Sequence, residues 1–133
     1  MDCNSNFTKK HMLLIQEYIQ LILWVQSQLK LWHWQTTSYS QHKAFEEIYG
    51  GLDDLFDELI ENLQGSHRIT FGEKNCKIDS LLDINEKDIV SFVEATIYKF
   101  EGLTALNSSK GIINIRDDIL TQLEKLRYLL SLK

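Results

Sequence analysis

The sequence predicts an all-α protein, a bundle of four helices built as two helical hairpins joined by one long crossover. Three observations support this fold class. The 133 residues include no proline and only six glycines, which favours helices with short connections over a turn-rich β fold. Apolar residues recur at three- and four-residue intervals in four segments. The length suits one domain, residues 1–133, with one core and about seven flexible N-terminal residues.

The first two predicted helices form a hairpin. The first is expected from about Thr8 to Gln35, and its apolar residues lie on more than one face, which predicts contacts with more than one neighbour. The second is expected from Ser38 to Gly65. Ser38 and Gln41 have the spacing of a capping box, and Gly65 suits the position just after a helix C-terminus.

The rest of the chain holds the crossover and the second hairpin. Residues 65–85 lack helical periodicity at their start and leave room for one short helix around Ile78–Leu82. The third helix is expected to start at Asn85 or Glu86, and the fourth follows the turn NSSKGI. Two hairpins with a connection of this length are typical of a bundle with one crossover.

Charge and cysteine content narrow the class of function. The net charge of −5 argues against a protein that grips nucleic acid, so DNA binding is not expected. Cys3 and Cys76 lack a CxxC spacing and indicate reduced thiols in a cytosol-like compartment. No apolar run approaches a membrane span, and MDCNSNFTKK lacks the apolar region of a secretory signal. A cytoplasmic location is expected, or the virion or host cytoplasm for a phage-encoded chain.

One face of the second helix carries a histidine and several carboxylates. Counted at about 100° per residue from His42, Glu46 and Asp57 lie at about 40° and 60°. Glu61 follows at about 100° on the same stripe. His42/Glu46 and Asp57/Glu61 are i,i+4 pairs, a spacing at which two side chains can reach one ion. Acidic helix faces are more often simply solvated, so a surface without a ligand is the alternative interpretation.

The two pairs are symmetric about the middle of the helix. Positions 46 and 57 are eleven residues apart, about 16 Å, so the pairs cannot hold one ion within one chain. Positions 42 and 61 share the midpoint 51.5 with positions 46 and 57. Two antiparallel copies about a two-fold axis there would place His42 opposite Glu61 of a second copy. Gly50, Gly51 and Asp53 would then lie at the two-fold interface. The two glycines have no side chains, which would allow the two helices to approach closely.

Residues before this stripe add a family resemblance. His33-Trp34 ends the first helix, His42 and Glu46 open the second, and the run Asp57-Glu58-Leu59-Ile60-Glu61 lies near its end. This pattern resembles the Dps family, the mini-ferritins, whose first helix ends in His-Trp. Their second helix carries a histidine, an acid four residues later and an Asp-Glu-x-x-Glu. The resemblance is specific over about residues 10 to 65.

The resemblance implies a ferritin-like four-helix bundle that forms a two-fold dimer within a shell of twelve subunits. It implies a ferroxidase that oxidises Fe(II) with hydrogen peroxide or dioxygen and stores ferric iron in the shell. One or two iron ions would bind at the dimer interface, with zinc as a substitute. The implied catalytic residues and metal ligands are His33, His42 and Glu46 of one chain with Asp57 and Glu61 of the other, and Trp34 would lie beside them.

The sequence departs from the family in three ways. The segment WQTTSYSQ between His33 and His42 is shorter than the family's usual loop, which affects the placement of His33. Glu46 stands where aspartate is common and reaches one methylene further. The chain carries no long lysine-rich tail, which weakens any expectation of DNA binding. A non-catalytic alternative stays open, namely a Dps-like metal-binding or structural oligomer without turnover.

Overall fold

The computed structural model describes residues 9–66, 68–69, 71–74, 76–103 and 109–132. It shows an all-α four-helix bundle, with no strand among these residues. The helices are α1 (Lys9–Gln35), α2 (Tyr39–Ser66), α3 (Glu86–Glu101) and α4 (Lys110–Ser131). The fold class and the helix starts agree with the prediction, and the expected flexible N-terminus lies outside the described residues.

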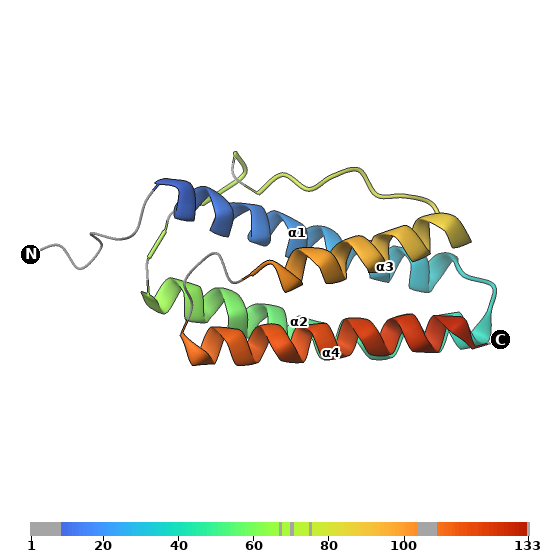
Figure 1. Ribbon diagram of the computed structural model, residues 1–133. Helices are drawn as coiled ribbons and strands as arrows, with labels where there is room; N and C mark the ends of the chain where they lie inside the picture. The colour runs from blue at the N-terminus through green and yellow to red at the C-terminus, as the bar shows by residue number, and fades with distance from the viewer. Residues whose placement is uncertain (1–8, 67, 70, 75, 104–108, 133) are drawn as a thin grey trace, which may run out of the picture.

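The four helices form two antiparallel hairpins, α1 with α2 and α3 with α4 (Figure 1). The crossover from α2 to α3 returns along α1, so α2 and α3 run in the same direction (Figure 1). Helix α2 packs on both α1 and α4, and α3 packs on α4. This is the predicted topology, in which one long connection spans the bundle.

Polar caps set the starts of three helices. The Ser38 hydroxyl accepts a hydrogen bond from the Gln41 N–H at 3.3 Å. The Asn85 side chain accepts from the Asp88 N–H at 2.8 Å, and the Ser109 hydroxyl accepts from the Ile112 N–H at 3.3 Å. These bonds satisfy N–H groups that have no partner within their own helix.

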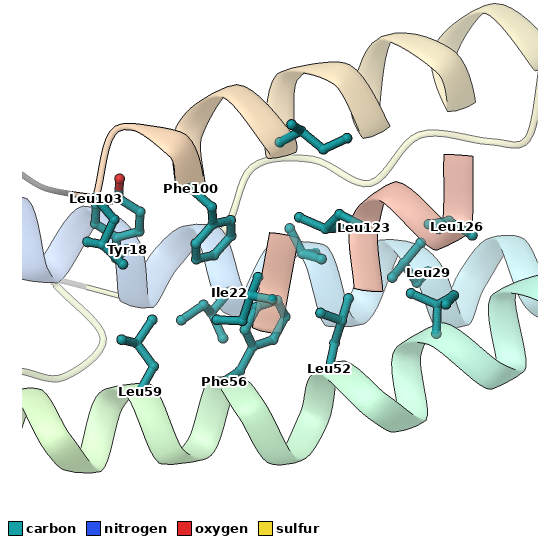
Figure 2. Close-up of a cluster of buried hydrophobic side chains, with 14 of the residues drawn as sticks. Tyr18, Ile22, Leu29, Leu52, Phe56, Leu59, Phe100, Leu103, Leu123 and Leu126 are labelled. Atoms are coloured by element: carbon teal, nitrogen blue, oxygen red, sulfur yellow. The ribbon is translucent and has the colours of Figure 1, made fainter. Parts of the chain in front are cut away.

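Apolar side chains from all four helices meet in one core (Figure 2). Tyr18 and Phe100 pack with ring centroids 5.6 Å apart, which joins α1 to α3. Phe56 stacks on Phe100 at 5.7 Å, which joins α2 to α3. The core is continuous from one end of the bundle to the other, so it holds the two hairpins in a fixed relation.

The crossover differs from one expectation. The short helix for which residues around Ile78–Leu82 left room is absent, because residues 76–85 form no helix. Gln28 of α1, fully buried, donates to the Leu82 carbonyl at 2.9 Å and accepts from the Leu82 N–H at 2.8 Å. Further bonds to α1 run from Trp24 to the Ser80 carbonyl, from Trp32 to the Leu82 carbonyl and from the Ile84 N–H to Gln35. Because side chains of α1 satisfy these backbone groups, the segment needs no helical hydrogen bonds.

None of the helices among the described residues is both long and apolar enough to cross a membrane.

Candidate metal centre

A three-residue turn, 36–38, brings two histidines face to face. His33 lies near the end of α1 and His42 in the first turn of α2. Their ring centroids are 3.8 Å apart and the rings are nearly parallel, at 21°. The short loop therefore places His33 directly against His42, which the sequence could not establish.

Each ring is held by the backbone of the other residue. His33 Nδ1 lies 2.9 Å from the His42 carbonyl oxygen, and His42 Nδ1 lies 3.0 Å from the His33 carbonyl oxygen. A carbonyl oxygen only accepts, so each Nδ1 carries the proton and donates it. In the neutral ring, Nε2 is then the nitrogen with the lone pair. Both rings thus have the tautomer and the Nδ1–H···O=C support that metal-binding histidines have.

His33 is also enclosed by residues that the sequence did not single out. It is only 7% exposed, and its Nε2 makes no hydrogen bond within the described residues. Tyr49 of α2 meets the His33 ring nearly at right angles, with centroids 5.5 Å apart. The Lys30 ammonium lies 5.6 Å from the centre of the Tyr49 ring. Tyr49 is seven residues after His42, two helical turns, and that spacing was the available signal for it.

The carboxylates of the stripe are more exposed than the histidines. Glu46 forms an ion pair with Lys43 at 3.3 Å, and this side-chain hydrogen bond raises the pKa of Lys43. Asp57 and Glu61 are both exposed on α2. Within the described part of one chain, no three His, Cys, Asp or Glu side chains come together as a metal site. The structure joins His33 to His42 and does not bring Asp57 or Glu61 to them.

The expected interface residues have different surroundings. A side chain at Gly50 would meet nothing within 4 Å, whereas a Cβ at Gly51 would lie 3.0 Å from the Gln122 side-chain oxygen on α4. The absence of a side chain at Gly51 thus has an explanation within one chain, while Gly50 lies open. Asp53 accepts a hydrogen bond from Gln26 at 2.8 Å. Trp34 is 72% exposed and is no core residue.

A shallow groove runs beside the acidic end of the stripe. It has a volume of about 420 Å³ and lies between α1 and α2, next to Phe71 and Cys76. Its walls include Asp53 and Asp57 together with the apolar side chain of Leu23. The face formed by α1 and α2 is therefore hollowed and partly apolar in the single chain.

Comparisons with known proteins identify relatives without assigning them a function. Residues 33–130 match a family described as "Family of unknown function (DUF5856)". A protein of Enterobacteria phage T4, "Uncharacterized 14.6 kDa protein in mobD-ri intergenic region", is 37% identical over 49 residues. These residues are 37% of this chain and 38% of the phage protein, so the match spans less than half of that relative. No solved structure matches the chain.

Proposed function

The chain belongs to the DUF5856 family of unknown function, and we propose that it binds ferrous iron between two copies and oxidises it, as the mini-ferritins do. His33, His42 and Glu46 of one copy would bind the iron with Asp57 and Glu61 of the second. The observation that carries the proposal is the histidine pair, in which reciprocal carbonyl hydrogen bonds leave both Nε2 atoms as lone-pair donors.

The donor set fits iron as the substrate. Imidazole nitrogens suit ferrous iron, and carboxylate oxygens suit both ferrous and ferric iron. Zinc accepts the same donors and could replace iron. No three candidate ligands, Glu46 included, come together within the described part of one chain, so the proposed site depends on ligands from a second copy. Asp57 and Glu61 are exposed, so a second copy could reach them without a change of fold.

The chemistry would need two ferrous ions for each peroxide. One hydrogen peroxide takes up two electrons and two protons and leaves as two water molecules, while two Fe(II) become two Fe(III). The two ions could share one site or occupy the two symmetric sites of a dimer. The carboxylates would stabilise the additional positive charge of the ferric product. Storage of that product in a shell of twelve subunits is the further part of the proposal.

A specific observation favours a second candidate, metal binding without turnover. Glu46 is already paired with Lys43 at 3.3 Å. If that ion pair persisted in the dimer, the site would have fewer free carboxylates to stabilise the ferric product. The protein would then be a metal-binding or structural oligomer.

Iron oxidation can be tested with ferrous iron and peroxide under anaerobic conditions. The parent protein should form ferric absorbance faster than protein-free buffer does. His33→Ala and Glu61→Ala should each slow this oxidation by at least about tenfold, since loss of a residue that supports a metal ligand already costs about 10- to 100-fold. Glu58→Ala is the matched control, because Glu58 is exposed on α2 but lies on another side of the helix.

The control should retain the parent rate. A parent rate equal to that of buffer, with Glu61→Ala indistinguishable from the parent, would exclude turnover. Calorimetric titration with Zn(II) would then decide whether the site binds metal at all. Circular dichroism of each variant separates loss of the site from loss of the fold.

A further inference from the structure

The crossover is extended where it passes α1. Ser80 and Ile84 bind the side chains of Trp24 and Gln35, which are eleven residues apart on the helix. Eleven residues of helix span about 16 Å. Four residues of chain approach that length only in an extended backbone, at about 3.3 Å per residue. This segment is therefore extended as it passes α1, although it belongs to no sheet within the described part of the chain.

One edge of this extended segment is open. The backbone groups held by α1 all belong to even-numbered residues, namely Ser80, Leu82 and Ile84. In an extended chain, the backbone groups of alternate residues point to opposite edges. The groups of the odd-numbered residues in 79–83 therefore point away from α1, and among the described residues none of them has a hydrogen-bond partner. Such an edge is a template for another strand.

We infer that the partner of this edge is the same segment of a second copy, paired antiparallel about Ser80. The run Lys77-Ile-Asp-Ser-Leu-Leu-Asp83 is self-complementary in this register. Lys77 lies opposite Asp83 of the second copy, and each dimer contains this charge pair twice. Lys77 makes no ion pair within the described part of its own chain. Opposite charges across an antiparallel pair stabilise it.

The apolar side chains of the segment agree with the same register. Ile78 and Leu82 are 42% and 39% exposed. Paired about Ser80, Ile78 lies opposite Leu82 of the second copy on one face of the two-stranded ribbon. Both side chains lose water contact on pairing, which favours association.

The crossover and α2 lie at the same level along α1 but on opposite sides of it, because Trp24 and Gln26 point about 160° apart around the helix. Gln26 binds Asp53, which sets the midpoint of α2 level with this part of α1. Trp24 binds the Ser80 carbonyl. Trp24 and Gln26 are two residues apart, about 3 Å along the helix. The centre of the crossover and the centre of the α2 stripe are therefore at nearly one level, and Leu23, 40% exposed, lies at this level on α1. Since the open edge points away from α1, the paired crossovers would lie between the two α1 helices. This pairing therefore has a two-fold axis of its own, separate from that of the proposed metal site, and does not require metal.

A cysteine at the axis tests the register directly. In this register Ser80 lies opposite its own copy in a non-hydrogen-bonded pair, with Cα atoms about 4.5 Å apart, within the range of a disulfide. Ser80→Cys, in a Cys3→Ser/Cys76→Ser background without metal, should form a covalent dimer on mild oxidation. Leu82→Cys is the matched control, because it would lie four residues along the ribbon from its own copy, about 13 Å. It should stay uncrosslinked.

Exchanging the charges of Lys77 and Asp83 tests the same pairing without a covalent crosslink. Lys77→Glu should weaken dimer association by roughly tenfold, because two opposite-charge pairs become like-charge pairs. Lys77→Glu/Asp83→Lys should restore association, as measured by sedimentation equilibrium in chelator. Asp83→Lys alone measures the effect of losing the bond that Asp83 accepts from Gln35.

Two results would overturn the inference: a metal-free chain that stays monomeric, or equal crosslinking of Ser80→Cys and Leu82→Cys. Neither result depends on iron oxidation. A crosslinked dimer that fails to oxidise iron would instead contradict the proposed function alone, so the two failures are distinguishable.

Discussion

At the scale of single residues, several side chains bind backbone groups that belong to another segment of the chain. His33 and His42 each bind the other's carbonyl oxygen, which sets their tautomers. Gln28 uses both ends of its amide on Leu82, 54 residues later. Such bonds contribute most when they are buried, because a lost partner leaves a group that water cannot reach.

Gln28→Leu should lower the free energy of unfolding by about 1 to 3 kcal/mol. The Leu82 carbonyl would keep its bond from Trp32, but the Leu82 N–H would lose the partner it has in the parent. Gln20→Leu is the control, because Gln20 is half-buried and makes no hydrogen bond within the described residues; its change should stay within about 0.5 kcal/mol. Urea unfolding measures both. Equal stabilities of the two variants would show that the Gln28 bonds do not hold the crossover.

At the scale of elements, the helices and the long connection between the hairpins were predictable, but the extended path of the crossover was not. The four helices follow from periodic apolar residues and from caps such as Asn85, which are local signals. The crossover has no periodicity of its own, because α1 supplies its hydrogen bonds. Helix α2 combines both cases. Residue spacing predicted its polar stripe, whereas the different surroundings of Gly50 and Gly51 depend on where α4 packs.

The two glycines of α2 should respond differently to alanine. Gly50→Ala should raise the free energy of unfolding of the monomer by about 0.5 to 1 kcal/mol, since its Cβ meets no atom and the helix is stiffened. Gly51→Ala should gain less, because its Cβ would lie 3.0 Å from the Gln122 side chain. Thermal unfolding at high dilution measures both.

If two copies associate through α2 as proposed, the same Gly50→Ala change should weaken that association, because the new methyl group would lie beside the proposed two-fold axis. Sedimentation velocity at higher concentration measures this effect. Unchanged association would remove Gly50 from the interface and leave the monomer stability result standing.

At the scale of the whole molecule, one chain carries the residues of both halves of the proposed metal site and the crossover edge proposed to pair with a second copy. His33 is buried and His42 half-buried, and both rings are held by hydrogen bonds, whereas Asp57 and Glu61 are exposed. A metal that needs both halves binds the dimer better than the monomer. By linkage, such a metal must strengthen the dimer.

Zn(II) should therefore raise the dimer association constant of the parent protein by about 100-fold. This value applies when free Zn(II) is about ten times the dissociation constant of one site, because two sites form in each dimer. Asp57→Asn/Glu61→Gln should abolish this response. Glu58→Gln should keep it, because that residue lies outside the stripe. Sedimentation equilibrium with and without chelator gives the constants. An equal zinc response in all three proteins would place the metal elsewhere.

The sequence by itself determined the all-α class, the helix starts within a residue or two and the positions of His42, Glu46, Asp57 and Glu61 on one stripe. These features depend on residues a few positions apart, so spacing is enough to predict them. Only the tertiary structure decided that His33 stacks on His42, that Gly51 faces α4 and that the crossover is extended with one open edge. Each of these depends on contacts between segments that are distant in the chain or joined by a turn of unusual length. No local pattern encodes such contacts, because the partner that satisfies each group lies on another element.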